Sequence, residues 1–181
     1  GSAMTTIRGA YFKRTWTSSV SVAVFDVEAN GLLEDATRVH CLVVDARTYH
    51  DDPNIKPRHG SLRAGLNYLH SKDLIVAHNG LTYDLPLLHR LYDWRPRAYF
   101  FDTQVEARRR FPDIAVDDTG REEFPKHLTG WHSLRAWGHR LGVHKDELET
   151  DWHAFNEAML RYCLQDVLVT KHLYDFLLES H

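Results

Sequence analysis

One stretch constrains the fold of this chain more than any other, an apolar run that ends in two closely spaced carboxylates. Residues 20–25 are rich in valine, as in a strand buried at the centre of a sheet, and Asn30-Gly31 marks a turn just beyond. Asp26 and Glu28 are two residues apart. Because successive side chains of an extended chain point to opposite sides, both carboxylates point to the same side. They are either solvated residues at a strand–turn junction or oxygen ligands for a divalent cation such as Mg²⁺ or Mn²⁺.

Length and composition place the chain in a broad class. With 181 residues, 43% hydrophobic and 26% charged, residues 20–181 are predicted to form one globular domain, preceded by a tag remnant and arm at 1–19. No apolar run reaches the roughly 20 residues that span a bilayer, so no membrane partner is expected. Cys41 and Cys163 are predicted to be buried thiols in a reducing compartment. The net charge of −3 argues against DNA binding by the whole surface.

Hydrophobic periodicity predicts a mixed α/β fold. The expected strands are 20–25, 39–45, 47–50, 74–77 and 98–101, and the expected helices are 61–70, 85–91, one through 105–107, 131–141 and 154–178. Two prolines, a glycine and many charges predict a long loop over 111–128.

Two further acids stand where a site would form. Asp84 follows the predicted strand 74–77 and the turn His78-Asn79-Gly80, and sites gather beyond the carboxyl ends of such strands. It could equally be a helix N-terminal acid favoured by the macrodipole. On the last helix, Tyr162 and Asp166 are four residues apart and share a face. Asp166 borders the apolar stripe, where a charge needs a metal or hydrogen bonds, whereas Tyr162 could be an ordinary boundary tyrosine.

In this order, Asp26-x-Glu28, Asn79-x-x-x-Tyr83-Asp84 and Tyr162-x-x-x-Asp166 resemble the three motifs of the DEDDy 3′→5′ exonucleases. Further segments are similar to the proofreading domain of the family A DNA polymerases of T-seven-like phages: Phe25 to Leu33, Asp102-Thr103, Leu134 to Gly142 and Phe155 to Lys171. The resemblance covers most of the chain. It implies the DnaQ-like, RNase H-like fold, an α/β architecture with a mixed five-stranded sheet flanked by helices.

The resemblance also implies roles for these residues. Asp26, Glu28, Asp84 and Asp166 would hold two divalent metal ions, Mg²⁺ or Mn²⁺, for phosphodiester hydrolysis. Asp26 would bridge both ions, and Tyr162 would orient the attacking water. The products would be nucleoside 5′-monophosphates.

Substrate contacts are less constrained by the sequence. Leu32 resembles the apolar wedge of the family but could be an ordinary turn or core leucine, and Asn79 could contact the substrate backbone or cap the next helix. Arg108-Arg109-Arg110 could follow phosphates or form a solvated face. The tryptophans at positions 131, 137 and 152 are predicted to be packing residues.

The predicted function is metal-dependent removal of nucleotides from single-stranded or mismatched DNA 3′ ends. The expected context is proofreading for a phage-type polymerase, as one of its domains or as a separate subunit, in the cytoplasm of a bacterium or a phage-infected host cell. Two alternatives remain open at this point: a 3′→5′ RNA exonuclease, and a non-catalytic nucleic-acid-binding or docking subunit on the same fold.

Overall fold

A five-stranded mixed sheet organises the molecule. The computed structural model describes residues 20–143 and 147–180, so the predicted N-terminal arm lies outside the described residues. The strands are β1 (Val22–Ala29), β2 (Val39–Val44), β3 (Arg47–Tyr49), β4 (Leu74–Ala77) and β5 (Tyr99–Asp102). They lie in the order β3-β2-β1-β4-β5. Strands β2 and β3 extend β1 as antiparallel hairpins, whereas β4 and β5 run parallel to it, which confirms the predicted mixed sheet.

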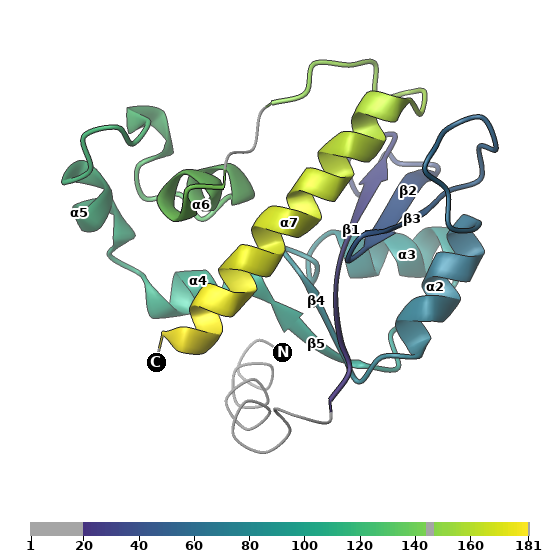
Figure 1. Ribbon diagram of the computed structural model, residues 1–181, viewed down its shortest axis with the longest axis horizontal. Coiled ribbons are helices and arrows are strands. Elements are labelled where there is room, and N and C mark those ends of the chain that lie inside the picture. The colour runs from purple at the N-terminus through teal and green to yellow at the C-terminus, as the bar shows by residue number, and fades with distance from the viewer. Residues whose placement is uncertain (1–19, 144–146, 181) are drawn as a thin grey trace.

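Helices cover both faces of this sheet (Figure 1). They are α2 (Leu62–His70), α3 (Asp84–Tyr92), α4 (Thr103–Arg110), α5 (Ile114–Thr119), the 3₁₀ turn η1 (Lys126–Leu128), α6 (Leu134–Leu141) and α7 (Glu157–Glu179). The long helix α7 crosses one face diagonally, and α2 and α3 lie on the opposite face. The architecture is therefore helix layers around one central sheet.

Alternation along β1 separates two hydrophobic cores. Val24 packs with Cys163 and Val167 of α7, whereas Phe25 and Val27 belong to the core beneath α2 and α3. Because side chains alternate, the positions two and four residues beyond Val24 face α7 as well. The central strand thus carries its even-numbered side chains, including both predicted ligands, toward α7.

Side-chain caps determine where three helices begin. Ser61 accepts a hydrogen bond from the Ala64 N–H, which confirms it as the predicted N-cap of α2. Helix α6 begins at Leu134 rather than at residue 131, because Ser133 is its N-cap. Helix α7 begins at Glu157 rather than at 154, because the Asn156 side chain accepts from the Met159 N–H. Capping residues supply partners for helix N–H groups that would otherwise have none, so they end the preceding loop.

The prediction of a structureless loop over 111–128 is wrong. Helix α5 forms within it because Ile114 packs into the core under α7 and Asp118 binds Arg140 of α6. The two guanidinium–carboxylate hydrogen bonds measure 2.9 and 2.7 Å, and Asp118 also accepts the Gly130 N–H. Burial disfavours the charged form of Asp118, but the hydrogen bonds from Arg140 and Gly130 hold its pKa below the ordinary value. Tertiary contacts, rather than local propensity, make this segment helical.

Two expectations from composition can be compared with the structure. Cys41 and Cys163 are both free and fully buried, so the prediction of buried thiols is confirmed. Among the described residues, no helix is both long and apolar enough to cross a membrane.

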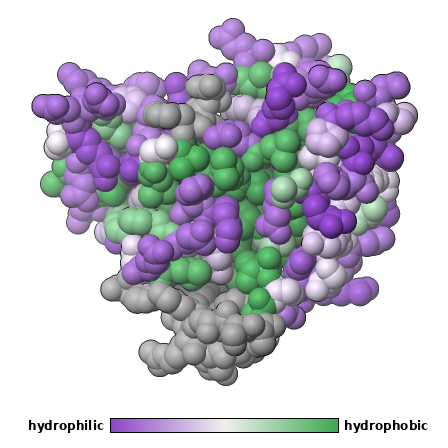
Figure 2. Space-filling view, viewed as in Figure 1, coloured by the Kyte–Doolittle hydropathy of each residue, from purple (hydrophilic) through white to green (hydrophobic). Residues whose placement is uncertain are grey.

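A groove of about 660 Å³ lies between α7 and the segments at Val22 of β1 and at Asp45 and Ala46 of the turn between β2 and β3. Figure 2 shows hydrophobic side chains gathered beside this helix and bordered by hydrophilic ones. Leu168, which is 46% exposed, contributes to the groove together with Leu164 and Ala46. None of the residues that line this groove is a predicted site residue, so the groove is separate from the predicted site.

The Asp118–Arg140 pair should be essential for stability. Arg140→Ala leaves a buried carboxylate without its cation and should lower the free energy of unfolding by about 3–5 kcal/mol, measured by urea denaturation. Arg161→Ala is the matched control, since it breaks the exposed Arg161–Glu157 pair and should cost less than about 1 kcal/mol. Equal losses for the two variants would contradict this account.

Candidate active site

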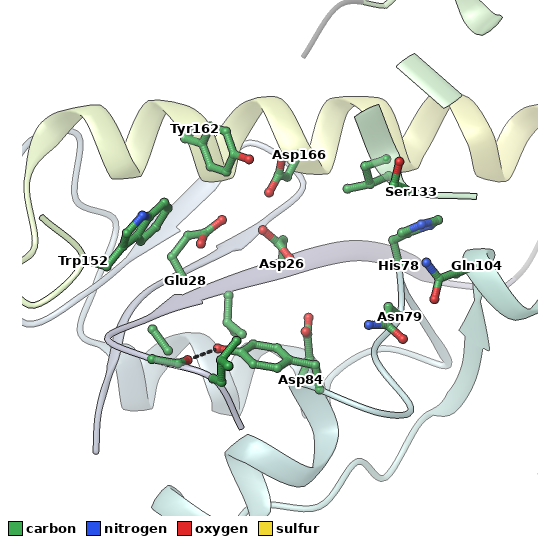
Figure 3. Close-up of a pocket in the computed structure, with 16 residues that line it drawn as sticks. Asp26, Glu28, His78, Asn79, Asp84, Gln104, Ser133, Trp152, Tyr162 and Asp166 are labelled. Carbon is green, nitrogen blue, oxygen red and sulfur yellow. Dashed lines mark hydrogen bonds between the residues drawn. The ribbon is translucent and has the colours of Figure 1, made fainter. Parts of the chain in front are cut away.

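Two carboxylates of strand β1 lie on the face of the sheet that α7 covers. Asp26 and Glu28 follow Val24 at alternate positions, and both line a pocket at the end of the strand. Figure 3 shows them pointing toward Tyr162 and Asp166, which descend from α7. The prediction that Asp26 and Glu28 share one side of the strand is confirmed.

Helix α7 supplies the opposite wall of the pocket. Tyr162 and Asp166 both line it, and Asp166 is only 5% exposed. Between them, the Cys163 thiol hydrogen-bonds the backbone oxygen of Asp26 at 3.4 Å and its Oδ2 at 3.5 Å. Burial raises the pKa of this thiol, so it stays protonated and can donate. Cys163 thereby ties α7 directly to the central carboxylate.

Asp84 enters the pocket from a third element. It is the first residue of α3 and is 3% exposed, although it carries a carboxylate. Its Oδ2 is buried and makes no hydrogen bond within the described residues. The alternative role of Asp84, as an acid favoured by the macrodipole at a helix N-terminus, does not require its carboxylate to be buried. An oxygen in this position, buried and aimed into a polar pocket, is suited to receive a cation.

Buried Asp102 shapes the turn that precedes Asp84. Its carboxylate accepts backbone N–H groups from Asn79 at 2.9 Å and Leu81 at 3.0 Å. It also caps α4 by accepting from Gln104 and Val105. One fully buried side chain therefore joins the end of β5 to the turn after β4 and fixes the path of that turn.

The two predicted substrate contacts also line the pocket. Leu32 is 76% exposed, so the reading of it as a core leucine is wrong. Asn79 has a left-handed backbone, with φ of 61°, and its side chain accepts from Thr82 rather than capping α3. The N-cap of α3 is Tyr83, which has no side-chain cap bond. The capping alternative for Asn79 is therefore wrong, and a substrate contact remains the open interpretation.

All seven predicted site residues thus meet in one pocket of about 590 Å³. The pocket has further lining residues that the sequence interpretation did not assign to a site: Gln104, Ser133, Leu134 and Trp152. These come from loops and helix starts whose positions depend on long-range packing. Their only local signal is the N-cap pattern of Ser133.

Tyr83 closes the floor of the pocket. Its hydroxyl donates to the Gly31 carbonyl at 2.9 Å, the bond dashed in Figure 3. Burial, together with the charges of Asp84 and Glu28, raises its pKa to about 12. The hydroxyl therefore remains a donor that holds the turn after β1 against α3.

The carboxylates repel one another strongly. Burial raises the pKa of Asp26 well above its ordinary value, and the charges of Asp166, Glu28 and Asp84 raise it further. The pKa of Asp84 is raised by burial, then by Asp102 and Asp166. These raised pKa values describe the metal-free protein, because a bound cation would favour the charged carboxylates and lower their pKa values.

The donor set fits a hard divalent cation. Carboxylate oxygens of Asp26 and Glu28 lie within 4.8 Å of each other, and Asp84 adds a buried oxygen that makes no hydrogen bond within the described residues. Carboxylate oxygens are the ligands that Mg²⁺ and Mn²⁺ prefer. The residues present therefore suit the predicted cofactor.

The arginine run is mainly structural. Glu106 is fully buried and pairs with both Arg109 and Arg110 at 3.4 Å. Arg110 also donates to the Leu177 and Ser180 carbonyls at the end of α7. Arg108 and Arg109 are nevertheless exposed, as the solvated-face alternative predicts, and contact with substrate phosphates stays an open interpretation for them.

The three tryptophans have different surroundings. Trp137 is buried against Phe111 and Phe176, which confirms its predicted packing role. Trp131 is 61% exposed, so the packing prediction is wrong for it. Trp152 lines the pocket beside Glu28 (Figure 3).

Comparison with known proteins agrees with this geometry. A DNA-directed DNA polymerase of Enterobacteria phage T3 is 36% identical over 188 residues, covering 87% of this chain and 26% of the polymerase. The enzyme of Escherichia phage T7 is 34% identical over the same shares. Both matches fall in the exonuclease region, and the chain spans about a quarter of these relatives' length. The resemblance to the DnaQ-like exonucleases is confirmed.

Solved structures show the same fold. Brucella melitensis NrnC superposes with a TM-score of 0.60 at 19% identity, covering 91% of this chain and 76% of that chain. The family B DNA polymerase of Pyrobaculum calidifontis superposes with a TM-score of 0.57 at 19% identity, covering 88% and 24%. The predicted RNase H-like fold is therefore confirmed. No protein-family model matches the chain.

Charge repulsion in the pocket predicts a pH-dependent stability. Because the pKa of Asp84 is raised on folding, the contribution of Asp84 to the stability of the metal-free protein falls as pH rises above about 4, where this group loses its proton in the unfolded chain. Asp84→Asn removes a charge and should raise the Tm at pH 7, on a scale of about 2–4 °C per kcal/mol relieved. The gain should shrink toward pH 4.

Thermal unfolding in EDTA across this pH range is the measurement. Mn²⁺ should then raise the Tm of the wild type more than that of Asp84→Asn. Asp175→Asn, an exposed acid on α7, is the control and should show neither effect. A difference in Tm between Asp84→Asn and the wild type that does not change between pH 4 and pH 7 would contradict the prediction.

Proposed function

We propose that this protein is a metal-dependent 3′→5′ exonuclease acting on single-stranded DNA ends. One observation carries the proposal: four carboxylates from β1, α3 and α7 converge with Tyr162 on one open pocket. The relationship to the exonuclease region of phage polymerases supports the reaction class. NrnC, which shares the fold, has been solved with bound Mg²⁺ and bound to pGG.

The four acids would share the work of holding metal ions. Asp26, central between β1 and α7, would contact both ions, with Glu28 and Asp166 completing one site and Asp84 serving the other. When bound, divalent ions lower the pKa of a coordinated water and neutralise charge on the phosphate. Cys163 and Asp102 would act behind the acids, since their hydrogen bonds hold Asp26 and the turn before Asp84.

Tyr162 would orient the attacking water through its hydroxyl. With an ordinary pKa near 10, a tyrosine is better suited to orientation than to proton removal at neutral pH. Leu32, strongly exposed on the rim, would contact the terminal base, and Asn79 would contact the substrate backbone.

DNA is the proposed substrate because the matched phage relatives are DNA polymerases. Proofreading beside a polymerase, with that polymerase as partner, is the proposed context. An RNA exonuclease would use the same acids, so the sugar preference is a direct outcome of the assay. A purely docking role is disfavoured because all four acids are present and converge.

The decisive assay is digestion of a 5′-labelled single-stranded DNA with Mg²⁺ or Mn²⁺, resolved by length. A ladder that shortens from the 3′ end is expected. The double variant Asp26→Ala, Asp166→Ala should lower the rate by more than about 10²–10³-fold, the loss typical of one electrostatic stabiliser. EDTA should abolish cleavage.

A matching RNA strand and the surface variant Asp175→Asn complete the assay. Asp175 lies on α7 outside the pocket, so this variant should retain full activity. An intact DNA strand with folded, metal-loaded wild type would refute the proposed activity. Internal cuts in place of a ladder would refute the polarity.

Tyr162 should affect turnover rather than binding. Tyr162→Phe removes only the hydroxyl and should lower kcat by about 10²-fold, the scale of a misplaced reactant, with KM nearly unchanged. Tyr174→Phe makes the same substitution on the same helix outside the pocket and should be neutral. Steady-state kinetics on the labelled strand measure both, and a KM effect alone would assign Tyr162 to binding.

A further inference from the structure

Trp152 occupies one end of the pocket. It lies beside Glu28, with His78 and Gln104 at the opposite end (Figure 3). Its ring meets that of Tyr162 edge to face, with centroids 6.1 Å apart and planes at 72°. The large aromatic side chain is only partly buried, and it is the one aromatic residue besides Tyr83 and Tyr162 among the residues lining this pocket.

The backbone at Trp152 is held by β2. His40 Nε2 hydrogen-bonds the Trp152 carbonyl at 2.7 Å. A carbonyl oxygen can only accept, so Nε2 carries the proton. The neighbouring His153 carbonyl accepts from Arg38 at 3.4 Å. His40 of β2 and Arg38, which directly precedes β2, therefore hold the segment that presents Trp152.

His40 is itself immobilised. It is 4% exposed, and its ring stacks on Phe155 with centroids 5.9 Å apart and planes at 13°. Phe155 also packs on His50, at 5.0 Å. A buried imidazole that packs on one side and donates on the other is a rigid support, and none of its ring atoms lines the pocket.

A nucleic-acid pocket needs a surface that accepts any base. Carboxylates and metal ions engage the phosphodiester, whereas bases bind without sequence preference by stacking on aromatic faces. Leu32 offers an apolar side chain, but only an aromatic ring offers a face of the size of a base. Tyr83 is committed to the Gly31 carbonyl on the floor of the pocket.

We propose that Trp152 is a substrate-binding residue on which a base next to the scissile bond stacks, and that His40 is the positioning residue that holds it in place. This inference rests on the proposed nuclease function and adds to it a defined base-binding wall. It also gives a role to His40, a buried histidine that does not line the pocket.

Binding to matched strands tests the stacking. The probe is a short 5′-fluorescein-labelled oligothymidylate in EDTA, compared with the same strand carrying abasic residues at its 3′ end, by fluorescence anisotropy. Trp152→Ala should weaken binding of the oligothymidylate by about 5- to 150-fold, the range measured for loss of one stacked base. The abasic strand should bind wild type and variant equally.

Two tryptophan variants sharpen the result. Trp152→Phe keeps an aromatic face and should restore most of the affinity. Trp131→Ala removes an exposed tryptophan that does not line the pocket and should leave both affinities unchanged. Equal losses on both strands for Trp152→Ala would show a structural role and overturn the proposal, as would equal binding of the two strands by the wild type.

The proposed positioning role of His40 is tested with the variants His40→Gln and His40→Ala. Glutamine retains a donor and should keep base-dependent binding, whereas alanine should lose part of it, with circular dichroism confirming that both variants fold. If His40→Ala binds like the wild type, the positioning role falls. Because binding is measured without hydrolysis, base-dependent affinity can survive even if the exonuclease assay fails, and the two proposals fail separately.

Discussion

Repulsion among carboxylates that are buried together is the constraint on which this structure depends. Burial raises the pKa values of Asp26 and Asp84, and the nearby charge of Asp166 raises both further. Such an arrangement persists only where the surrounding packing over-determines it and where a ligand relieves it. The sheet core, helix α7 and the turn before Asp84 together supply that packing.

The supports around the acids come from residues that perform no chemistry themselves. The Cys163 thiol bonds Asp26, the Asp102 carboxylate organises the turn before α3, and the Tyr83 hydroxyl closes the floor. His40 likewise hydrogen-bonds the backbone carbonyl of Trp152 at the rim of the pocket. Each contact joins elements far apart in sequence, so the geometry of the pocket and the tertiary fold are stabilised by the same bonds.

Much of this was predictable from the sequence because its signals are local. Alternation in 20–28 predicts both the central strand and the shared side of Asp26 and Glu28, and four-residue spacing places Tyr162 with Asp166 on α7. Helix α5 was not predictable, because the contact between Asp118 and Arg140 of α6 exists only in the packed structure. The exposure of Trp131 and the pocket position of Trp152 likewise depend on where the surrounding loops settle.

The sequence by itself determined the strand and helix periods, the order of the acidic motifs and the resemblance they carry, because these follow from spacing along the chain. Only the tertiary structure decided how deeply Asp84 is buried, that Asn79 does not cap its helix, that the arginine run pairs with Glu106, and that Trp152 faces the acids. Those outcomes depend on which surfaces exclude water together, and water exclusion is a property of the packed molecule rather than of any segment.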